Sequence, residues 1–408
     1  MSQISPFVGL LFDRSRVGPL ERVTTPPYDT ISPREQRRFL GASPHNVIRL
    51  DLGEDRPGDD QVENKYMRAS AELRRWREEG VLVETAHPAH YPYEMRFTLH
   101  GARRRVRGLI CAVELEGWGG SILPHESIMP GPAEDRLRLI RAVRANLSSI
   151  HALFSGPCPP LSELLARMSR TEPAAQAGDE EGVEHRMWVA EEDTGIRDWL
   201  AGQTLMIADG HHRYEMALRF RDEMRALHGP GPWDRVMMLL MDTSTENPPV
   251  LPFHRILISD APHVDGSRVR DLQEVLDEVA DDRLEFGVAA REEGQVVHRV
   301  GKLEGEPPTV SALHRTILDG RDGDLRFTPD AVEAEEAVRQ GLAAAAFFLP
   351  ATTASRIRSV IDRGERLPQK STYFWPKPRT GMVIRSLDSG VTPPPRDRAS
   401  LSPWPRPP

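Results

Sequence analysis

The sequence predicts an α+β protein with an α/β-like core, and three observations point to it. An apolar run, Leu205-Met-Ile-Ala, ends in Asp209-Gly210, and an amphipathic helical pattern begins immediately afterwards. The continuous apolar run from Val236 to Met241 is typical of a strand that is buried on both faces. Helical patterns alternate with such runs along the chain, as they do in layered cores of helices and sheet.

Composition limits the classes of function that the chain can have. It has 408 residues, is 39% hydrophobic, carries a formal charge of −8 and has a pI of about 6.0. No global positive field favours nucleic acid, and no apolar run is long enough to span a membrane. The N-terminus lacks the pattern of a signal peptide, and the two cysteines, Cys111 and Cys158, form no metal or redox motif. We therefore expect a cytoplasmic protein with neither nucleic acid nor membrane as partner.

The first 60 residues contain a stiff loop followed by a helix start. Two prolines precede Tyr28-Asp29, and Ser32-Pro33 with Glu35 predicts a capped helix with proline in its first turn. Asp29 on this loop is a candidate catalytic carboxylate, with an Asx-type turn as the structural alternative. The alternation in residues 46–53 predicts a strand.

The next elements are a helix and a hairpin. Residues 62–79 carry one apolar helical stripe that stops at Gly80, and its members are expected in the core. They are Val62, Tyr66, Ala69, Leu73 and Trp76.

Strands are predicted at 91–97 and 105–113, paired around His100-Gly101. The arginines near that turn are expected on a solvated edge, and the polar stretch 171–181 is expected to be a surface loop.

Residues 121–156 combine a proline-rich loop, a helix and a strand. The loop carries His125-Glu126, which suits an acid, a base, a metal ligand or a hydrogen-bonded loop pair. The helix is predicted to begin near Pro132, and a strand is predicted over 148–154. Further candidate residues here are Arg136, Arg144 and Asn146.

The strand–turn–helix at 205–220 is the strongest candidate site. The first amide N–H groups of a helix have no partner within it, and the positive end of its dipole lies there. Here they would lie beside His211, His212 and the planar guanidinium of Arg213, a combination that suits phosphate or another anion. The structural alternative is that Asp209 merely caps the helix.

The C-terminal part predicts a second lobe. Helices are expected at 269–279, 329–341 and 354–363, a strand at 344–349 and a last strand from Gly381. Between them lies a proline-bracketed loop whose ammonium groups, hydroxyls and rings suit an anion or a nucleotide base: Lys370, Ser371, Tyr373 and Lys377. We expect an N-terminal α/β body at 1–258, a C-terminal α/β lobe at 259–387 that includes this loop, and a disordered proline-rich tail at 388–408.

Seven motifs follow one another along the chain: Pro-Pro-Tyr28-Asp29, Asn46-Val-Ile-Arg-Leu, Leu-Pro-His125-Glu126, Pro-Gly-Pro-Ala-Glu-Asp135-Arg136, Arg144-Ala-Asn146, Ala-Asp209-Gly-His-His-Arg213-Tyr-Glu215 and Pro-Gln-Lys370-Ser-Thr-Tyr373-Phe-Trp-Pro-Lys377. Together they resemble the bacterial and archaeal family called domain-of-unknown-function 1015. The resemblance runs from about residue 4 to residue 387.

The Gly210–Glu215 motif has a more distant likeness. It resembles the signature of sulfiredoxin and that of the free serine kinases related to ParB partition proteins. That likeness implies a ParB/sulfiredoxin-like core whose helix N-terminus holds nucleotide phosphates, with His212 and Arg213 in contact and Asp209 needed for catalysis through Mg²⁺. His211 replaces the catalytic cysteine of sulfiredoxin, so sulfinic-acid repair is not expected, and no basic DNA-reading domain like that of ParB is evident.

These observations lead to a hypothesis about function. We expect a nucleotide-dependent phosphotransferase that acts on a hydroxyl of serine or a related metabolite, with ATP or ADP as donor, CTP as an option and Mg²⁺ bound at Asp209. Asp29 and Glu126 are alternative general bases. Glu215 is a further candidate site residue. The alternatives are a CTP-type nucleotide-binding switch and a metal-dependent hydrolase that uses His125, Glu126, His211 and His212.

Overall fold

The computed structural model describes residues 3–126, 131–191, 195–280 and 282–388. Its largest sheet has nine strands and mixes parallel and antiparallel pairs. The strand order is β6-β11-β8-β12-β5-β4-β10-β9, with β1 beside β5. The strands are β1 (Ile4–Ser5), β4 (Tyr91–Leu99), β5 (Ala102–Glu114), β6 (Ile122–Pro124), β8 (Ile150–Phe154), β9 (Ala175–Gly178), β10 (Glu184–Met187), β11 (Leu205–Asp209) and β12 (Arg235–Asp242).

Both faces of this sheet are covered, which explains why β12 is apolar throughout. Met237 and Leu239 belong to one hydrophobic cluster, whereas Met238 and Leu240 belong to another on the opposite face. Successive side chains of a strand point to opposite faces, so a doubly buried strand needs apolar residues at every position. The prediction of a buried strand here is confirmed.

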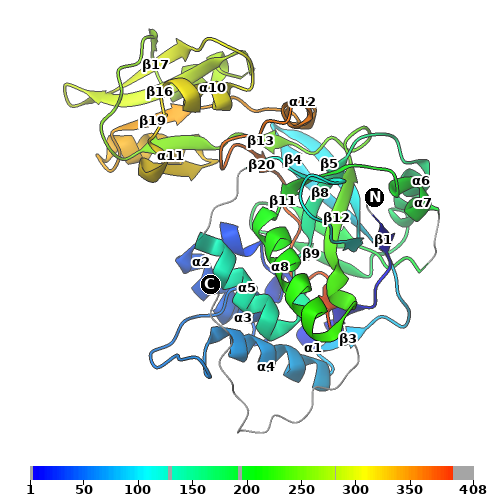
Figure 1. The fold of residues 1–408 in the computed structure, drawn as a ribbon. Helices are drawn as coiled ribbons and strands as arrows, with labels where there is room; N and C mark the ends of the chain where they lie inside the picture. The colour runs from blue at the N-terminus through cyan, green and yellow to red at the C-terminus, as the bar shows by residue number, and fades with distance from the viewer. Residues whose placement is uncertain (1–2, 127–130, 192–194, 281, 389–408) are drawn as a thin grey trace.

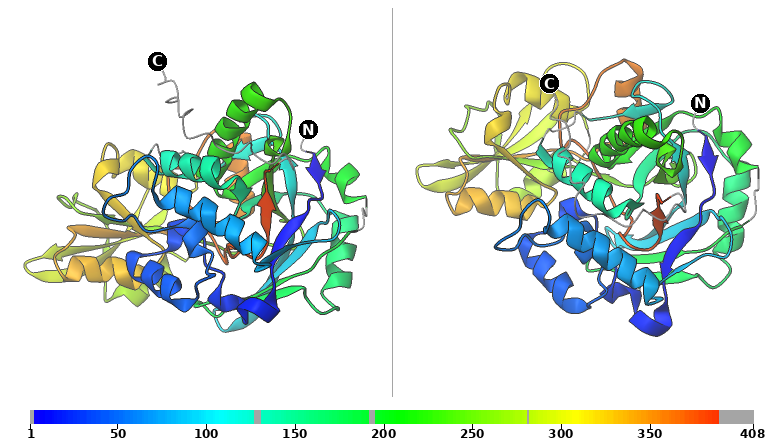
Figure 2. Two further views of the ribbon diagram at one scale, coloured as in Figure 1. Left: turned by 90° about the horizontal axis from the view of Figure 1, so that it is seen from below. Right: turned by 60° about the horizontal axis from the view of Figure 1, so that its bottom comes forward.

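Helices cover the sheet in the arrangement seen in Figures 1 and 2. The helix α8 (His211–His228) contacts β8 and packs along α5 (Gly131–Val143), which in turn packs against α4 (Lys65–Glu78). The helices α6 (Pro159–Met168) and α7 (Ile196–Leu200) contact the sheet at β4, β5 and β1. Among the described residues, no helix has the length and apolar character needed to cross a membrane.

Two small sheets bring the end of the chain back to this body. The strand β21 (Ile384–Ser386) lies between β2 (Gly9–Phe12) and β7 (Ala145–Asn146), and β3 (Leu82–Glu84) completes that sheet. The strand β20 (Tyr373–Phe374) pairs with β13 (Val250–Leu251). The segment that carries Lys370 and Lys377 therefore lies against the N-terminal body.

A separate six-stranded sheet has the order β15-β17-β16-β19-β14-β18 and stands apart in Figure 1. Its strands are β14 (His254–Leu257), β15 (Ser267–Val269), β16 (Glu285–Glu292), β17 (Gln295–Lys302), β18 (Leu325–Thr328) and β19 (Ala345–Phe348). The helices of this part are α9 (Leu272–Glu278), α10 (Thr309–Thr316), α11 (Ala331–Arg339) and α12 (Ala354–Asp362), with the 3₁₀ turn η4 (Asp322–Asp324). The sheet starts at residue 254, slightly before the expected boundary, and residues beyond about 364 leave it. The expected tail, apart from Asp388, lies outside the described residues.

The N-terminal elements include one confirmed and one wrong prediction. The helix α2 (Pro33–Ala42) has a capping box between Ser32 and Glu35 with proline in its first turn, as predicted. Residues 46–53, in contrast, contain a short helix, α3 (Ile48–Asp51), because the Asn46 side chain accepts the amide of Ile48 at 2.9 Å and starts a helical turn. The remaining elements here are α1 (Arg14–Val17), η1 (Leu20–Arg22) and η2 (Tyr28–Thr30).

Other predicted elements are present with small differences in their bounds or type. The helices expected at 62–79, 269–279, 329–341 and 354–363 are present, but Val62 precedes α4 and is 63% exposed, so it lies outside the core stripe. The stretch 171–181 is not only a loop, since it contains the edge strand β9. The turn η3 (Pro232–Asp234) links α8 to β12.

Candidate functional site

The predicted strand–turn–helix is present, and glycine is required at its turn. Gly210 lies between β11 and α8 with a φ of +96°, a left-handed conformation that disfavours other residues. A Cβ atom at this position would meet the Arg213 guanidinium, with Nε at 3.0 Å. The glycine therefore lets Arg213 fold back against the turn.

Asp209 does not cap the helix. Its carboxylate accepts hydrogen bonds from Arg213 Nη2 and from Lys377 Nζ, both at 2.5 Å. Burial alone would raise the pKa of Asp209, but Lys377 and Arg213 outweigh it and hold this pKa well below its usual range. The carboxylate is therefore ionised, and it orients two cations at the start of α8.

Lys377 joins two carboxylates that are far apart in the sequence. Its Nζ lies 2.5 Å from Asp209 and 3.6 Å from Asp29, and only 10% of its side chain is exposed. Burial alone would lower the pKa of Lys377, but the two carboxylates raise it above its ordinary value. Lys377 is therefore a fixed positive charge at physiological pH.

The helix N-terminus adds donors to the same place. The first intrahelical hydrogen bond of α8 is donated by Tyr214 to Gly210, so the amides of residues 211–213 precede it. Arg213 Nη1 is held by Ser148 Oγ and the carbonyl oxygen of Ser149, both at 2.8 Å. A rigid guanidinium and a positive dipole end therefore share one location.

These groups line one cleft of about 80 Å³. A water molecule needs roughly 15 Å³ of such volume, so the cleft has room for about five waters or one phosphate group. Its walls come from residues 28–29, Glu126, residues 208–213, Phe253, residues 369–370, Thr372 and Lys377. The fold thus brings together four segments in which the sequence had suggested separate sites.

Glu126 holds the Lys370 loop in place. Its carboxylate accepts the backbone N–H groups of Lys370, Ser371 and Thr372 at 3.1, 2.9 and 3.0 Å. It also accepts the Thr372 hydroxyl at 2.9 Å. Burial acts to raise the pKa of Glu126, but hydrogen bonding and charge from His125 lower it to about 2. A carboxylate with so many donors and so low a pKa is a poor general base and a good anchor.

Two histidines of the region, His125 and His211, are engaged in hydrogen bonds. His125 donates from Nδ1 to the carbonyl oxygen of Ile207 at 2.6 Å, and its Nε2 lies 2.6 Å from Thr372 Oγ1. His211 Nε2 accepts the backbone N–H of His125 at 3.4 Å, and burial lowers the pKa of His211 to about 3. These hydrogen bonds disfavour a metal site that uses both His125 and His211, because a metal would have to displace them.

The remaining predicted residues lie at varied distances from the cleft. Arg136 donates to Asp51 at 2.9 Å and stacks over the Tyr28 ring at 4.0 Å, close behind the cleft. Asn146 accepts the Met237 amide at 3.1 Å within the sheet region.

Four other predicted residues make structural contacts or lie away from the cleft. Glu215 accepts the Trp118 indole at 2.7 Å, and the buried Ser371 donates to the Pro368 carbonyl oxygen at 2.6 Å. The Tyr373 ring packs edge to face against Phe253 near the Lys377 ammonium, and burial raises the pKa of Tyr373 to about 12. Arg144 directly follows α5 and does not line the cleft.

Several cleft residues were not selected from the sequence. Tyr28 and Phe253 line the walls, and each follows a proline in a short loop. A proline-fixed loop with an aromatic residue is a signal that was present in the sequence. Gln369 and Thr372 also line the cleft, and only the fold reveals their place there.

The residues present are a partial fit for Mg²⁺. Carboxylate oxygens of Asp209 and Asp29 are ligands that this ion accepts, but Lys377 and Arg213 already neutralise Asp209. Within the described part of the chain, no group of three or more His, Cys, Asp or Glu side chains is arranged to hold a metal. A magnesium ion here would need phosphate oxygens from a ligand to complete its coordination.

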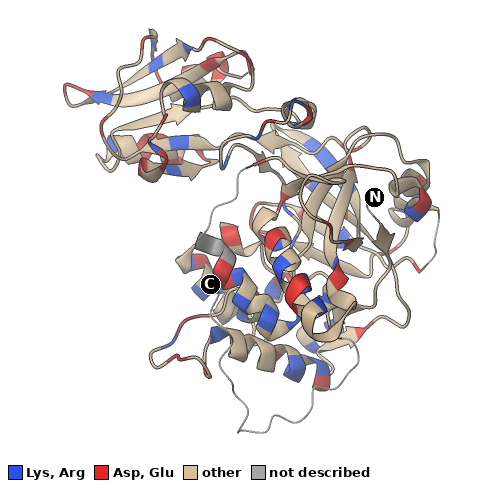
Figure 3. Ribbon diagram, in the orientation of Figure 1, with Lys and Arg blue, Asp and Glu red and all other residues tan. Residues whose placement is uncertain are grey.

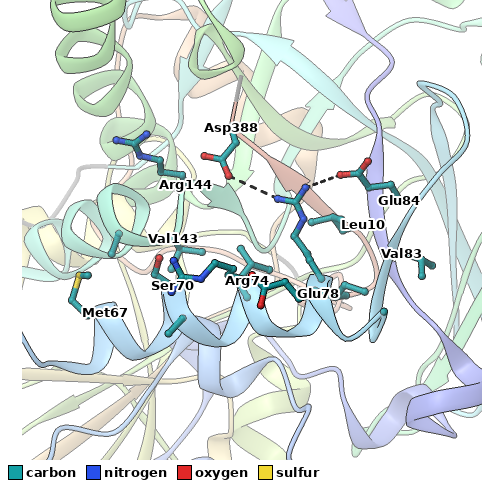
Figure 4. A pocket seen from close by; sticks show the side chains of 16 residues that line it. Leu10, Met67, Ser70, Arg74, Glu78, Val83, Glu84, Val143, Arg144 and Asp388 are labelled. Atoms are coloured by element: carbon teal, nitrogen blue, oxygen red, sulfur yellow. Dashed lines mark hydrogen bonds and ion pairs between the residues drawn. The ribbon is translucent and has the colours of Figure 1, made fainter. Parts of the chain in front are cut away.

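A much larger cavity, about 1280 Å³, lies between α4, β2, β3 and the end of α5 (Figure 4). Its charged residues include Arg77, which pairs with Glu84 at 2.8 Å and with Asp388 at 3.9 Å. Charges of both signs are mixed along α4, α5 and α8 (Figure 3). The large cavity has neither a helix N-terminus nor a buried cation held between carboxylates, so we place the candidate site at the smaller cleft.

Comparisons with known proteins assign the chain to a family. A family model described as "Protein of unknown function (DUF1015)" matches residues 4–317, so the match stops short of the expected residue 387. No curated protein matches.

Solved structures similar to this chain include a conserved hypothetical protein from Pyrococcus furiosus, with 13% identity, a TM-score of 0.33, and coverage of 62% of this chain and 86% of that one. A free serine kinase in complex with AMP has 14% identity, a TM-score of 0.35, and coverage of 65% and 88%. A C-terminally truncated SbnI from Staphylococcus aureus has 12% identity, a TM-score of 0.36, and coverage of 66% and 84%.

Proposed function

The chain belongs to the DUF1015 family of proteins of unknown function, and we propose that it is a nucleotide-dependent phosphotransferase for a small-molecule hydroxyl. One observation carries the proposal: Asp209, Asp29, Arg213 and Lys377 converge at the N-terminus of α8 in a cleft the size of a phosphate group. Phosphoryl transfer depends mainly on positioned phosphates, neutralised charge and an oriented nucleophile.

The phosphates of the nucleotide would bind to the positive groups of the cleft. Arg213, Lys377, His212 and Lys370 all line the enclosed space, and the amides of residues 211–213 would add donors to the phosphates. Because only about 80 Å³ is enclosed, the base and ribose would extend outward, where the Phe253 ring provides an apolar surface.

Asp29 is the carboxylate best placed to receive a proton. It lines the cleft, and its side chain is 29% exposed, whereas Glu126 is saturated by donors from the Lys370 loop. In the proposed step the substrate hydroxyl oxygen bonds to the terminal phosphorus as the bond from phosphorus to the bridging oxygen of the nucleotide breaks. The electron pair leaves with the shortened nucleotide, and the hydroxyl proton goes to Asp29.

Mg²⁺ fits this scheme as an ion brought by the nucleotide. Asp209 would hold the ion, which when bound would neutralise charge on the phosphates. Lys377 would then release part of its contact with Asp209 and turn toward phosphate.

The proposal also includes three more specific expectations from the sequence, which concern the core, the acceptor and the nucleotide. They are a ParB/sulfiredoxin-like core around β11 and α8, serine or a related metabolite as acceptor, and ATP, ADP or CTP as the nucleotide. AMP is the ligand of the free serine kinase structure and is a sensible further probe.

The experiment is a thermal-unfolding panel with ATP, ADP, AMP and CTP, each with and without Mg²⁺. A ligand that binds only the folded state raises the melting temperature by mass action. We expect a shift for the wild type that is lost in Lys377→Met and kept in Lys302→Met, whose lysine is 74% exposed on β17. If no nucleotide shifts the wild type, or if Lys377→Met responds as the wild type does, the phosphate-cleft proposal is wrong.

A nucleotide switch without turnover remains the second candidate. A shift with CTP, self-association on adding CTP and no nucleotide diphosphate formed from ATP with any hydroxyl substrate would favour the switch over the transferase.

A further inference from the structure

Two stretches of chain join the six-stranded sheet to the N-terminal body. The chain enters that sheet through β13 and then β14, and it returns through residues 364–372 to β20. The strands β13 and β20 pair with each other, so the two stretches lie side by side (Figure 1). Both supply walls of the cleft, Phe253 on the first stretch and Gln369 and Lys370 on the second. The shape of the cleft therefore depends on how the two stretches are held together.

Arg255 lies where the two stretches meet. It is the second residue of β14, and its exposed fraction is 0%. Its Nη1 donates to the carbonyl oxygen of Phe253 at 2.6 Å, and its Nη2 makes a longer contact with the carbonyl oxygen of Gln369 at 3.5 Å. One guanidinium thus contacts both stretches, at the main chain of two residues that line the cleft.

The rest of this guanidinium is held by the C-terminal lobe. Its Nε donates to Nε2 of His314 on α10 at 3.1 Å, and its central carbon lies 5.3 Å from the centre of the Phe327 ring on β18. His314 can accept this bond only as a neutral imidazole, and burial lowers the pKa of His314 to about 4, so it is neutral at pH 7. Arg255 therefore connects two elements of the lobe to two walls of the cleft.

Packing alone does not explain a buried arginine of this kind. Burial lowers the pKa of Arg255 to about 9, so the guanidinium remains charged at neutral pH. It forms no ion pair with a carboxylate of the described residues, and Glu126 and Asp322 act on it only at longer range. A buried charge without a paired counter-ion is costly, and an apolar side chain of similar length would fill the space without that cost. Holding two carbonyl oxygens at once is a task that only a planar group with several donors performs.

From these contacts we propose that Arg255 is a positioning residue, which holds the Phe253 wall and the start of the Lys370 loop together from inside the C-terminal lobe. Lys370 directly follows the contacted carbonyl of Gln369, and its backbone has a left-handed φ of +52°. Such a conformation is unfavourable for lysine, so this corner keeps its shape only while its contacts hold it. Arg255 supplies one of these contacts, and Glu126 supplies another.

The consequence for ligand binding rests on the proposed function, because it requires that a nucleotide binds in this cleft. A displaced Phe253 would no longer offer its ring to the base, and a displaced Lys370 would no longer face the phosphates. The positioning itself needs no nucleotide, so it can be measured in the ligand-free protein.

The first measurement is hydrogen exchange of the full-length, ligand-free protein, read by mass spectrometry on peptides that cover residues 368–374. The amides of residues 370–372 donate to Glu126 and should exchange slowly in the wild type. In Arg255→Met they should exchange at least tenfold faster, because the carbonyl of Gln369 is no longer held.

Arg385→Met is the matched control. Arg385 is also buried, with 6% exposed, and its guanidinium donates to the carbonyl oxygens of Pro232 and Arg235 at 2.7 and 2.8 Å. None of these three residues lines the cleft. A general effect of losing a buried arginine would appear in both variants, whereas the positioning role predicts wild-type exchange at residues 370–372 in Arg385→Met.

The second measurement is calorimetric titration with ATP, ADP and CTP, each with Mg²⁺. For any nucleotide that the wild type binds, Arg255→Met should bind at least tenfold more weakly, and Arg385→Met should bind as the wild type does. Arg255→Lys keeps the charge, but an ammonium group does not reproduce the planar fork that meets both carbonyl oxygens. It should therefore not restore binding, and full affinity in Arg255→Lys would show that charge alone acts and overturn the positioning role.

The outcomes separate this inference from the proposed function. If Arg255→Met does not fold, His314→Leu replaces it, since that variant removes the acceptor of Nε and keeps Arg255. Wild-type exchange in the tested variant, equal acceleration in Arg385→Met, or unchanged nucleotide affinity would overturn the inference. Faster exchange that is absent from Arg385→Met, in a protein that binds no nucleotide, would support the positioning role and remove the transferase.

Discussion

Replacing Glu126 by glutamine should loosen the loop that carries Lys370. The carboxylate accepts three backbone N–H groups and the Thr372 hydroxyl, and Oε2 alone accepts the Lys370 amide at 3.1 Å. In Glu126→Gln an NH₂ group takes the place of one oxygen. Either this NH₂ group faces a backbone N–H donor, or the side chain rotates and one of the hydrogen bonds to the Lys370 loop is lost.

Two routes give a similar magnitude for this loss. Hydrogen bonds to charged groups contribute about 1.5–3 kcal/mol each, and the substitution removes one such bond and the charge behind the others. The pKa of Glu126 falls from an ordinary 4.5 to about 2, a difference that corresponds to about 3 kcal/mol of folding free energy. We expect Glu126→Gln to lower the free energy of unfolding by about 3 kcal/mol at pH 7.

The pH dependence has a definite sign. Because the folded-state pKa is lowered, the stabilisation by Glu126 is fully present above pH 4.5 and is lost as the pH falls through about 2. Urea unfolding from pH 7 down to the lowest pH at which the fold persists should therefore show the wild type and Glu126→Gln converging. The matched control is Glu84→Gln, since Glu84 is 54% exposed and pairs only at the surface. Equal stability of the two variants at pH 7, or a gap that does not narrow in acid, would refute the anchoring role.

Two smaller predictions concern the turn and the thiols. Gly210→Ala and Gly229→Ala should each lower the free energy of unfolding by about 1 kcal/mol, because both glycines have a positive φ. Only Gly210→Ala should weaken nucleotide binding, because its new Cβ atom meets Arg213, whereas the space at Gly229 is open. Urea unfolding with nucleotide titration tests this, and equal nucleotide affinity in the two variants would contradict it. Cys111 and Cys158 are fully buried and burial raises the pKa of both, so a disulfide reagent should label no thiol in the native protein and two in denaturant. Rapid native labelling would show that one of them is accessible.

Local signals predicted much of the fold. The apolar run of β12, the strand–turn–helix at Gly210 and the capping box at Ser32 are each specified by neighbouring residues, and all three are present. The helix at residues 48–51 was predicted as a strand because alternation was the only periodic feature in that window. In the structure the Ile48 N–H donates a hydrogen bond to the Asn46 side chain, and this local contact favours a helical turn over a strand.

The assembly of the site depends on long-range pairing that the sequence does not encode locally. Lys377 reaches Asp29 and Asp209 because β21 pairs with β2 in the small four-stranded sheet and β20 pairs with β13. The same return brings the Lys370 loop onto Glu126, which makes that carboxylate an anchor. A motif suggests which side chains act, but only the topology shows which of them meet.

The most direct measurement is the position of the phosphates in a structure of the protein with bound nucleotide. The account predicts phosphate oxygens within hydrogen-bond distance of Arg213, Lys377 and the amides of residues 211–213. A nucleotide whose phosphates lie elsewhere, for example beside Arg74 and Arg77 in the large cavity of Figure 4, would contradict it.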